Sequence, residues 1–292
     1  MKSDHPHSKD PPKAQGSLHP HGLAESPAPG PREAPLLEVN HLTSRYGEVC
    51  ALEDVSLRIW PGQFVAVIGP NGGGKTTLLR TMLGALRPHQ GSVTLKGRPI
   101  RRDNLGKIGY VPQLEAIDWT FPITVEELLL MGLYRKNHWL RRIGKEDRKR
   151  LHQMMERLNL SGLGKRHIRE LSGGQQQAAF LGRALMGEPD LILLDEPTAG
   201  LDIRSRDDVI HFLHEINHQG VAIVLTAHDL NWVAAHLPWV ICLNRRVIAE
   251  GPPQQVLNPQ VLQETYRGEM VVFQHDGMVM IGERPHFPAS QA

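Results

Sequence analysis

One stretch of the sequence combines the residues and the neighbours of a phosphate-binding loop. Residues 69–76 read Gly-Pro-Asn-Gly-Gly-Gly-Lys-Thr, which fits the pattern G-x-x-x-x-G-K-[ST]. They stand between an apolar run at 63–68 and a segment predicted to be helical at 76–86. Glycines let consecutive backbone N–H groups curl around a phosphate, and the positive end of the following helix points at the same anion. A glycine-rich turn without a ligand is the alternative, and the flanking strand and helix disfavour it.

The side chains of this loop have separate expected roles. Lys75 should reach the β- and γ-phosphates of a nucleotide, and the Thr76 hydroxyl should ligate Mg²⁺. The predicted phosphate-binding residues are Gly69, Pro70, Asn71, Gly72, Gly73, Gly74, Lys75, Thr76 and Thr77. The loop therefore predicts that the chain binds a nucleoside triphosphate.

A pair of carboxylates ends a second apolar run. Asp195 and Glu196 directly follow Leu191–Leu194. In open α/β sheets ligands lie at the carboxyl ends of the strands, so both acids should face the phosphates. Asp195 is expected to hold Mg²⁺ through water, and Glu196 is expected to polarise an attacking water as a general base.

Strands and helices that would position these groups alternate along the chain. Short apolar or alternating runs predict strands at 36–39, 52–60, 63–68, 91–95 and 107–111. Helices are predicted at 76–86, over most of 124–160, at 175–186 and at 204–219. Two further runs, Leu191–Leu194 and Val221–Thr226, are typical of parallel strands that are buried on both faces. The alternation predicts an α/β fold with a parallel sheet.

Composition limits the class of protein. The 292 residues carry a net charge of +2, which gives no argument for nucleic-acid binding. Hydrophobic residues make up 40% and charged residues 22%, as in globular proteins. No apolar stretch approaches the ~20 residues of a membrane-spanning helix, and the N-terminus lacks the apolar region of a signal peptide. Cys50 and Cys242 fit no metal-ligand spacing, so an intracellular, reducing compartment is expected.

The sequence divides into three predicted parts. Residues 1–35 are rich in proline and histidine and poor in large apolar residues, which predicts a disordered tail. Its histidines can bind metal loosely, but a plain polar tail is the preferred interpretation. Residues 36–250 form the main folded unit, with a helical subdomain at about 114–175, and residues 251–292 form a C-terminal extension. Hairpin turns are predicted at 244–246 and 275–277.

Further motifs stand in a fixed order around the phosphate loop. Leu171–Gln175 reads Leu-Ser-Gly-Gly-Gln, Gln113 ends a Tyr-Val-Pro-Gln sequence, and His228 follows the run at 221–226. A short Ala-Gly-Leu-Asp loop ends at Asp202. In kind, order and spacing these motifs resemble those of ATP-binding cassette (ABC) ATPases, over roughly residues 36–250.

The resemblance implies a fold and a site. The fold would be a P-loop NTPase (RecA-like) core with an antiparallel β subdomain, a helical signature subdomain and a short C-terminal extension. Tyr46 would stack on adenine, Gln113 and Asp195 would handle Mg²⁺ with Thr76, and His228 would contact the γ-phosphate. The catalytic residues would be Glu196, His228 and Gln113. The remaining nucleotide-binding residues would be Ser172, Gly173, Gly174, Gln175 and Asp202.

The same resemblance implies a dimer. Ser172 and Gly174 would bind the γ-phosphate of the nucleotide on the opposite protomer, so two copies of the chain would close head-to-tail over two ATP molecules. This agrees with the chemistry of the signature, since a glycine-rich turn before a helix is a second anion site. ATP binding should then close the dimer, and hydrolysis should release it.

Other segments are similar to those of the manganese, zinc and iron-type metal importers. These segments are Ile117–Val125, Leu130–Gly132, Trp139–Arg142 and Gln175–Gln177. The similarity implies an ATPase at the cytoplasmic face of the membrane, with a separate permease, an extracytoplasmic metal-binding protein, a divalent metal as cargo and no nucleic acid. The alternative to this assignment is a purely structural role, in which Trp119 and Phe121 only pack the core of a subdomain. Rival functions are siderophore or vitamin import, a soluble ABC protein acting on ribosomes or DNA, and a histidine-based metal chaperone.

One motif is judged to be a coincidence. Residues 214–218 fit the metalloprotease pattern H-E-x-x-H, and His211 adds a third histidine. On a helix His211, His214 and His218 share one face, opposite an apolar face, so they are predicted to lie in solvent. A catalytic zinc site needs a cleft and oriented neighbours, so a solvated helix face is the preferred interpretation.

Overall fold

The structure, a computed structural model, describes residues 34–101, 104–133, 143–275 and 278–283. Its centre is a six-stranded sheet in the order β10-β9-β3-β8-β7-β6, parallel throughout except for β10 against β9. The strands are β3 (Phe64–Ile68), β6 (Ile108–Val111), β7 (Leu191–Leu194), β8 (Ala222–Ala227), β9 (Trp239–Asn244) and β10 (Arg246–Gly251). The predicted α/β fold with a parallel sheet is confirmed.

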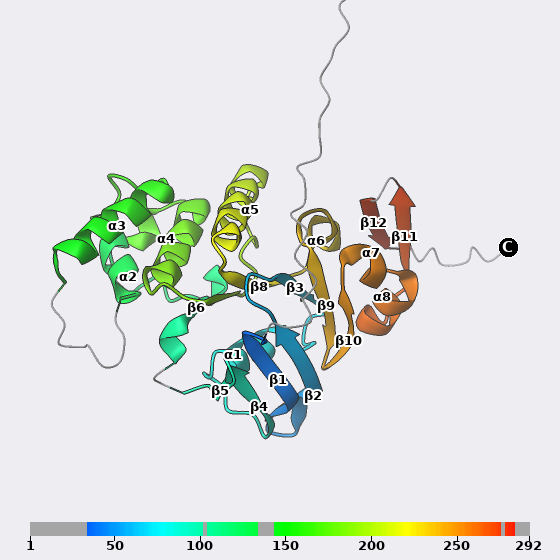
Figure 1. Cartoon of the computed structure of the whole chain (residues 1–292). Helices are drawn as coiled ribbons and strands as arrows, with labels where there is room; N and C mark the ends of the chain where they lie inside the picture. The colour runs from blue at the N-terminus through cyan, green and yellow to red at the C-terminus, as the bar shows by residue number, and fades with distance from the viewer. Residues whose placement is uncertain (1–33, 102–103, 134–142, 276–277, 284–292) are drawn as a thin grey trace, which may run out of the picture.

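The sheet is covered on both faces, which explains its unbroken apolar strands. Along β3, Phe64, Ala66 and Ile68 belong to one buried cluster, whereas Val65 and Val67 belong to another. Side chains alternate between the faces of a strand, so the two clusters are the two sides of the sheet. Figure 1 shows α4 (Gly173–Met186), α5 (Ile203–His218) and α6 (Leu230–His236) on one side.

A second, antiparallel sheet and one helix cover the opposite face (Figure 1). The sheet has the strand order β2-β1-β4-β5. Its strands are β1 (Leu37–Tyr46), β2 (Val49–Ile59), β4 (Gln90–Leu95) and β5 (Arg98–Pro99). Helix α1 (Lys75–Met82) is shorter than the predicted helix, which was expected to end at residue 86. Gly84 has a positive φ of 71°, a conformation that is incompatible with an α-helix.

A helical subdomain lies beside the sheet and contains α2 (Val125–Met131), α3 (Lys145–Arg157) and α4. Thr124 begins α2 with a capping box, since Glu127 N–H donates to its hydroxyl and the Glu127 carboxylate accepts from Thr124 N–H. Trp119 packs edge-on against Phe180 of α4 at 6.3 Å between ring centroids, whereas Phe121 is 63% exposed. The alternative that both aromatics only pack a subdomain core therefore fits Trp119 and is wrong for Phe121. The segment Trp139–Arg142 lies outside the described residues.

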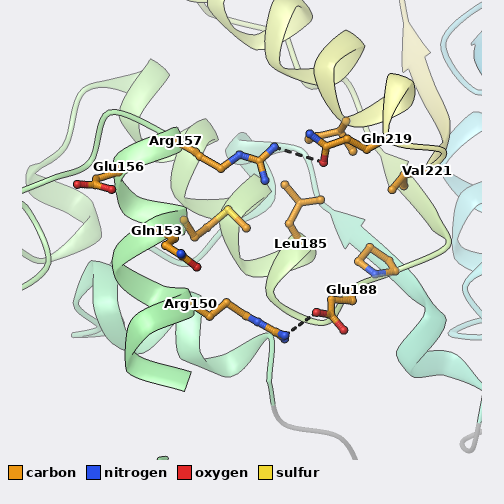
Figure 2. Close-up of a pocket in the computed structure, with 11 residues that line it drawn as sticks. Arg150, Gln153, Glu156, Arg157, Leu185, Glu188, Gln219 and Val221 are labelled. Carbon is orange, nitrogen blue, oxygen red and sulfur yellow. Dashed lines mark hydrogen bonds and ion pairs between the residues drawn. The ribbon is translucent and has the colours of Figure 1, made fainter. Parts of the chain in front are cut away.

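Two arginines of α3 connect this subdomain to the core (Figure 2). Arg150 donates to Glu188, and Arg157 donates to Glu215 Oε1 at 2.8 Å and lies over the Phe212 ring. Between them a cavity of about 570 Å³ separates α3 from the ends of α4 and α5, and Leu185 lines it between the two arginines. The arginine contacts thus bridge the cavity at its two ends.

The C-terminal part packs against the end of the sheet. It contains α7 (Pro253–Val256), α8 (Pro259–Tyr266) and a hairpin of β11 (Met270–His275) and β12 (Met278–Glu283). The hairpin is fixed to α6, since Asn231 donates to Ile281 O at 3.0 Å and accepts from Ile281 N at 2.7 Å. Both predicted hairpins, β9–β10 and β11–β12, are confirmed.

The histidine face of α5 differs from the prediction. His211 and His218 are exposed, but His214 is half-buried, with its ring edge-on to Phe64 of β3 at 5.1 Å between ring centroids. The solvated face was therefore wrongly predicted for His214, because the apolar stripe of α5 is wide enough to include it. Burial, and then the neighbouring histidines, lower the pKa of His214 below its usual value of 6.5. Within the described residues, no group of three His, Cys, Asp or Glu side chains is arranged to hold a metal ion.

The predicted tail, residues 1–35, lies almost entirely outside the described part of the chain. Across the ranges described above, none of the helices is both long and apolar enough to cross a bilayer.

Candidate nucleotide site

The phosphate loop runs from the end of β3 to the start of α1, as predicted. Two glycines are required by close approach: a Cβ on Gly69 would stand 1.9 Å from Leu243 O, and one on Gly74 would stand 2.5 Å from Ala51 O. Gly74 also has a positive φ of 97°, which places it in the left-handed region that favours glycine. The loop therefore presents its backbone N–H groups at the start of α1, in the arrangement that binds phosphate.

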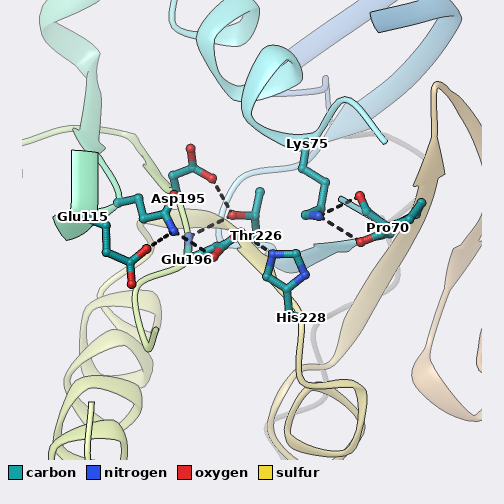
Figure 3. A network of polar contacts seen from close by, with 9 residues as sticks. Pro70, Lys75, Glu115, Asp195, Glu196, Thr226 and His228 are labelled. Carbon is teal, nitrogen blue, oxygen red and sulfur yellow. Dashed lines mark hydrogen bonds and ion pairs between the residues drawn. The ribbon is translucent and has the colours of Figure 1, made fainter. Parts of the chain in front are cut away.

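Lys75 lies inside this loop (Figure 3). Its Nζ donates to Gly69 O at 2.8 Å and to Pro70 O at 3.1 Å, and the side chain is buried. Burial lowers the pKa of Lys75, and the nearby carboxylates of Glu196 and Asp195 oppose that effect. Lys75 is thus a cation held close to both carboxylates by the loop itself.

The two carboxylates stand at the carboxyl end of β7, next to the loop. Thr226 on β8, a residue that the sequence did not single out, holds the Asp195 carboxylate and the Glu196 backbone. Its hydroxyl donates to Asp195 Oδ1 at 2.7 Å and accepts from Glu196 N at 2.9 Å (Figure 3). The one hydroxyl residue in the apolar run of β8 was the available signal, because a fully buried hydroxyl needs hydrogen-bond partners.

Glu196 is the centre of a polar network (Figure 3). Gln113 Nε2 donates to Glu196 Oε2 at 3.2 Å and also to Glu115, which the sequence did not suggest. His228 Nε2 contacts Glu196 Oε1. Glu196 has a φ of 50°, a conformation that is uncommon outside glycine and recurs at functional sites. The structure thus brings the three predicted catalytic residues into direct contact.

An open cleft of about 330 Å³ joins the phosphate loop to Glu196, and Gln113, Asp195 and His228 lie outside its lining. It is lined by Tyr46, Val49, Cys50, Ala51, Pro70, Asn71, Gly72, Gly73, Gly74, Lys75, Thr76, Thr77, Glu196 and Arg245. Tyr46, at the end of β1, is 48% exposed. The cleft therefore combines an accessible aromatic ring, a phosphate-binding loop and a carboxylate, and Arg245 is a lining residue that the sequence did not suggest.

The signature residues lie elsewhere. Ser172 and Gly173, at the start of α4, are exposed and do not line the cleft. Ser172 and Gln175 form a capping box: Gln175 N donates to Ser172 Oγ at 3.4 Å, and Ser172 N donates to Gln175 Oε1 at 3.1 Å. The structure therefore does not bring the signature onto the nucleotide cleft of the same chain.

Asp202 is close to the signature rather than to the cleft. It begins α5, where its carboxylate accepts from Ser205 N at 3.0 Å and from Ser205 Oγ at 2.8 Å, and these bonds lower the pKa of Asp202. A Cβ on Gly174 would stand 2.8 Å from Ser205 Oγ, so the starts of α4 and α5 touch. Asp202 acts as a helix cap in this structure, and its expected nucleotide contact stays a prediction.

The donor types fit the expected ligands. The glycine loop leads directly into the start of α1, whose first backbone N–H groups suit the phosphates of ATP. Thr76, Asp195 and Gln113 offer hydroxyl, carboxylate and amide oxygens, the hard ligands that Mg²⁺ prefers. A parallel sheet that ends in such a loop and a buried Asp195 defines a P-loop nucleotide-binding protein.

Comparison with known proteins narrows this class. A family profile described as "ABC transporter" matches residues 52–199. The chain belongs to this family, as the motifs from Gln113 to His228 predicted. The family binds ATP and couples its hydrolysis to transport, and in its importers the ATPases dimerise and work with membrane permeases.

Individual relatives bear names that fit the predicted group, the ATPases of manganese, zinc and iron-type metal importers. The chain is 36% identical over 247 residues to the manganese transport system ATP-binding protein MntB of Halalkalibacterium halodurans, covering 85% of this chain and 98% of the relative. It is 38% identical over 234 residues to the zinc transport system ATP-binding protein TroB of Treponema pallidum, covering 80% and 88%. Among solved structures, an inward-facing conformation of a protein assigned as a metal-chelate type ABC transporter has a TM-score of 0.72 and 29% identity, covering 87% of this chain and 98% of that one.

Proposed function

We propose that the chain is the ATP-hydrolysing subunit of an importer and energises uptake of a divalent metal cation of the manganese, zinc or iron type through a separate membrane permease. The observation that carries the proposal is the similarity to ATP-binding proteins of manganese and zinc transport systems along four fifths of the chain. The motif segments at 117–125 and 130–132 point to the same group.

The chemical step is attack of water on the γ-phosphorus of ATP. Glu196 accepts a proton from this water as the new P–O bond forms, and the bond to the bridging oxygen breaks so that ADP leaves. Gln113 and His228 both contact Glu196, which lines the cleft, and they orient its carboxylate. Lys75 and the loop N–H groups hold the β- and γ-phosphates, and Tyr46 stacks on the adenine.

Mg²⁺ is the expected metal at this site. Thr76, Asp195 and Gln113 would hold it, and when bound it would neutralise part of the charge on the β- and γ-phosphates. Thr226 contributes by fixing the Asp195 carboxylate through the 2.7 Å hydrogen bond.

The active unit is a head-to-tail homodimer. The start of α4, with Ser172 and Gly173 exposed and Gly174 and Gln175 half-buried, does not line the chain's own cleft, which supports a role on the nucleotide of a second copy. Asp202, adjacent to Gly174 through Ser205, would lie at the same interface.

Cellular placement follows from the same proposal. The subunit acts at the cytoplasmic face of the cell membrane as a translocase-type ATPase, bound to its permease rather than inserted. An extracytoplasmic metal-binding protein delivers the cation, and no nucleic acid takes part.

Metal uptake tests this function. We expect uptake of labelled Mn²⁺, Zn²⁺ or Fe²⁺ to fall in cells without the chain and in cells that carry Glu196→Gln, because both lack the hydrolysis step. The matched control is Glu264→Gln, an exposed carboxylate on α8 outside the site, which should transport normally. Unchanged uptake of all three metals in cells without the chain would contradict the proposal.

Chelated metal is a second candidate cargo. One relative, from Yersinia pestis, is named as a chelated iron transport system protein and is 36% identical over 236 residues. Uptake of the same metal offered free or bound to a siderophore separates the two: uptake of the chelate alone favours the second candidate.

A further inference from the structure

The turn between β9 and β10 contacts the phosphate loop through its backbone. Arg245 N donates to Gly73 O at 2.8 Å, and Arg245 O accepts from Glu53 N of β2 at 2.8 Å. Arg245 has a φ of 61°, the left-handed conformation of a tight hairpin turn. Its backbone is therefore held from two sides, by the loop and by the antiparallel sheet.

Neighbouring residues hold the same turn in place. Leu243 O lies against Gly69 and Gly73, so closely that a Cβ on either glycine would be 1.9 or 3.1 Å away. Asn244 Nδ2 donates to Thr265 O of α8 at 2.8 Å. The C-terminal helix, the turn and the phosphate loop thus form one packed unit, and Arg245 has a fixed position relative to the loop.

Arg245 differs from the arginine next to it in where it lies. Arg246 donates to Glu53, and it is absent from the lining of the cleft. Arg245 is exposed and lines the cleft together with Tyr46 and Lys75. It interacts electrostatically with Glu53, but the ion pair of Glu53 is with Arg246, and among the described residues no ion pair involves Arg245. A cation at the edge of a phosphate-binding cleft attracts anions, and an arginine can donate two hydrogen bonds to one phosphate.

We propose that Arg245 is a nucleotide-binding residue that donates to the phosphate chain of the bound nucleotide. This rests on the proposed function only in requiring that the cleft binds ATP. The position at Gly73, in the phosphate loop, is the reason to assign the contact to the phosphates rather than to the adenine. The C-terminal part of the chain thereby contributes to the nucleotide site through the turn that α8 holds.

Equilibrium binding of ADP to the full chain by titration calorimetry tests this contact. At 50 mM NaCl we expect Arg245→Asn to weaken ADP binding about three- to tenfold, because an exposed charge-assisted contact is lost. Asparagine tolerates the positive φ, so the turn should be retained. Arg245→Lys should keep most of the affinity, and the deficit of Arg245→Asn should shrink at 300 mM NaCl because salt screens an exposed charge.

Arg58→Asn is the matched control, since Arg58 is exposed on β2, pairs with Glu38 and is outside the cleft. It removes the same charge and should bind ADP within twofold of wild type. The inference is overturned if Arg245→Asn also binds within twofold of wild type, or if its deficit is neither restored by lysine nor reduced by salt. A wild-type chain that binds no ADP would instead refute the nucleotide site itself.

Discussion

Replacing Thr226 by valine removes one hydroxyl group and keeps the shape of the side chain. That hydroxyl donates to Asp195 Oδ1 at 2.7 Å and accepts from Glu196 N at 2.9 Å, and it is fully buried. The substitution therefore leaves one carboxylate short of a donor and one backbone N–H without an acceptor. The Asp195 carboxylate and the Glu196 backbone thereby both lose the group that fixes them.

The cost can be worked from these two bonds. A hydrogen bond to a charged group contributes about 1.5–3 kcal/mol, and a buried N–H left unpaired costs about 1–3 kcal/mol. Burying the additional methyl group of valine returns about 1 kcal/mol. We expect a net loss of about 1.5–5 kcal/mol in the free energy of unfolding, which in a chain of this size lowers the Tm by about 3–20 °C.

Thermal unfolding and ATP hydrolysis measure the two consequences. Thr226→Ser is the matched control: it keeps the hydroxyl and loses one methyl group, so it should cost about 1 kcal/mol and retain most of its ATPase rate. Thr226→Val should show the loss in the free energy of unfolding given above. Its ATPase rate should fall at least tenfold, since Asp195 and Glu196 are no longer fixed. Equal Tm and equal rates for the valine and serine variants would refute the bridging role of Thr226.

Three further perturbations test other parts of the structure. Glu196→Gln should bind ATP normally and hydrolyse it about 10²–10³-fold more slowly in the assembled transporter, and near-normal turnover would remove Glu196 as the base. Gly69→Ala should abolish ADP binding because its Cβ overlaps a backbone oxygen, whereas Gly268→Ala, with open space around it and no positive φ, should bind ADP normally. Burial lowers the pKa of His214, so its contribution to stability is present above pH 6.5 and is lost as the pH falls toward the folded-state pKa. His214→Gln should therefore flatten the fall of Tm between pH 7.5 and 5.5 more than His152→Gln, at an exposed histidine of α3, does, and equal slopes would contradict this.

Local patterns were sufficient for the elements and for the motifs that lie within one segment. The phosphate loop needs only its glycines and the adjoining strand and helix, and the burial of β7 and β8 follows from unbroken apolar runs. The end of α1 and the burial of His214 were wrongly predicted for a different reason. Both depend on neighbours outside the segment. Gly84 packs against Ile100, so that a Cβ on Gly84 would stand 2.7 Å from Ile100 Cγ2, and the His214 ring packs against Phe64 of β3.

The unpredicted site residues share one property. Thr226 and Arg245 come from strands β8 and the β9–β10 turn, which reach the phosphate loop only after the parallel sheet has formed. Neither residue belongs to a motif of fixed spacing, so their roles depend on strand order, which the sequence did not specify. A buried hydroxyl within an apolar strand was a usable signal for Thr226, whereas nothing local distinguished Arg245 from Arg246.

Two helices of this chain begin with glycine-rich anion sites, and they face different surroundings. Helix α1 begins inside the cleft with Lys75, while α4 begins at the exposed Ser172. The capping box uses the N–H groups of Ser172 and Gln175, and among the described residues no hydrogen bond uses those of Gly173 or Gly174. The first N–H groups of a helix need an acceptor, and here the chain's own cleft does not supply one. A phosphate held by the loop of a second copy would, so the exposed start of α4 supports the head-to-tail dimer on physical grounds as well as by family likeness.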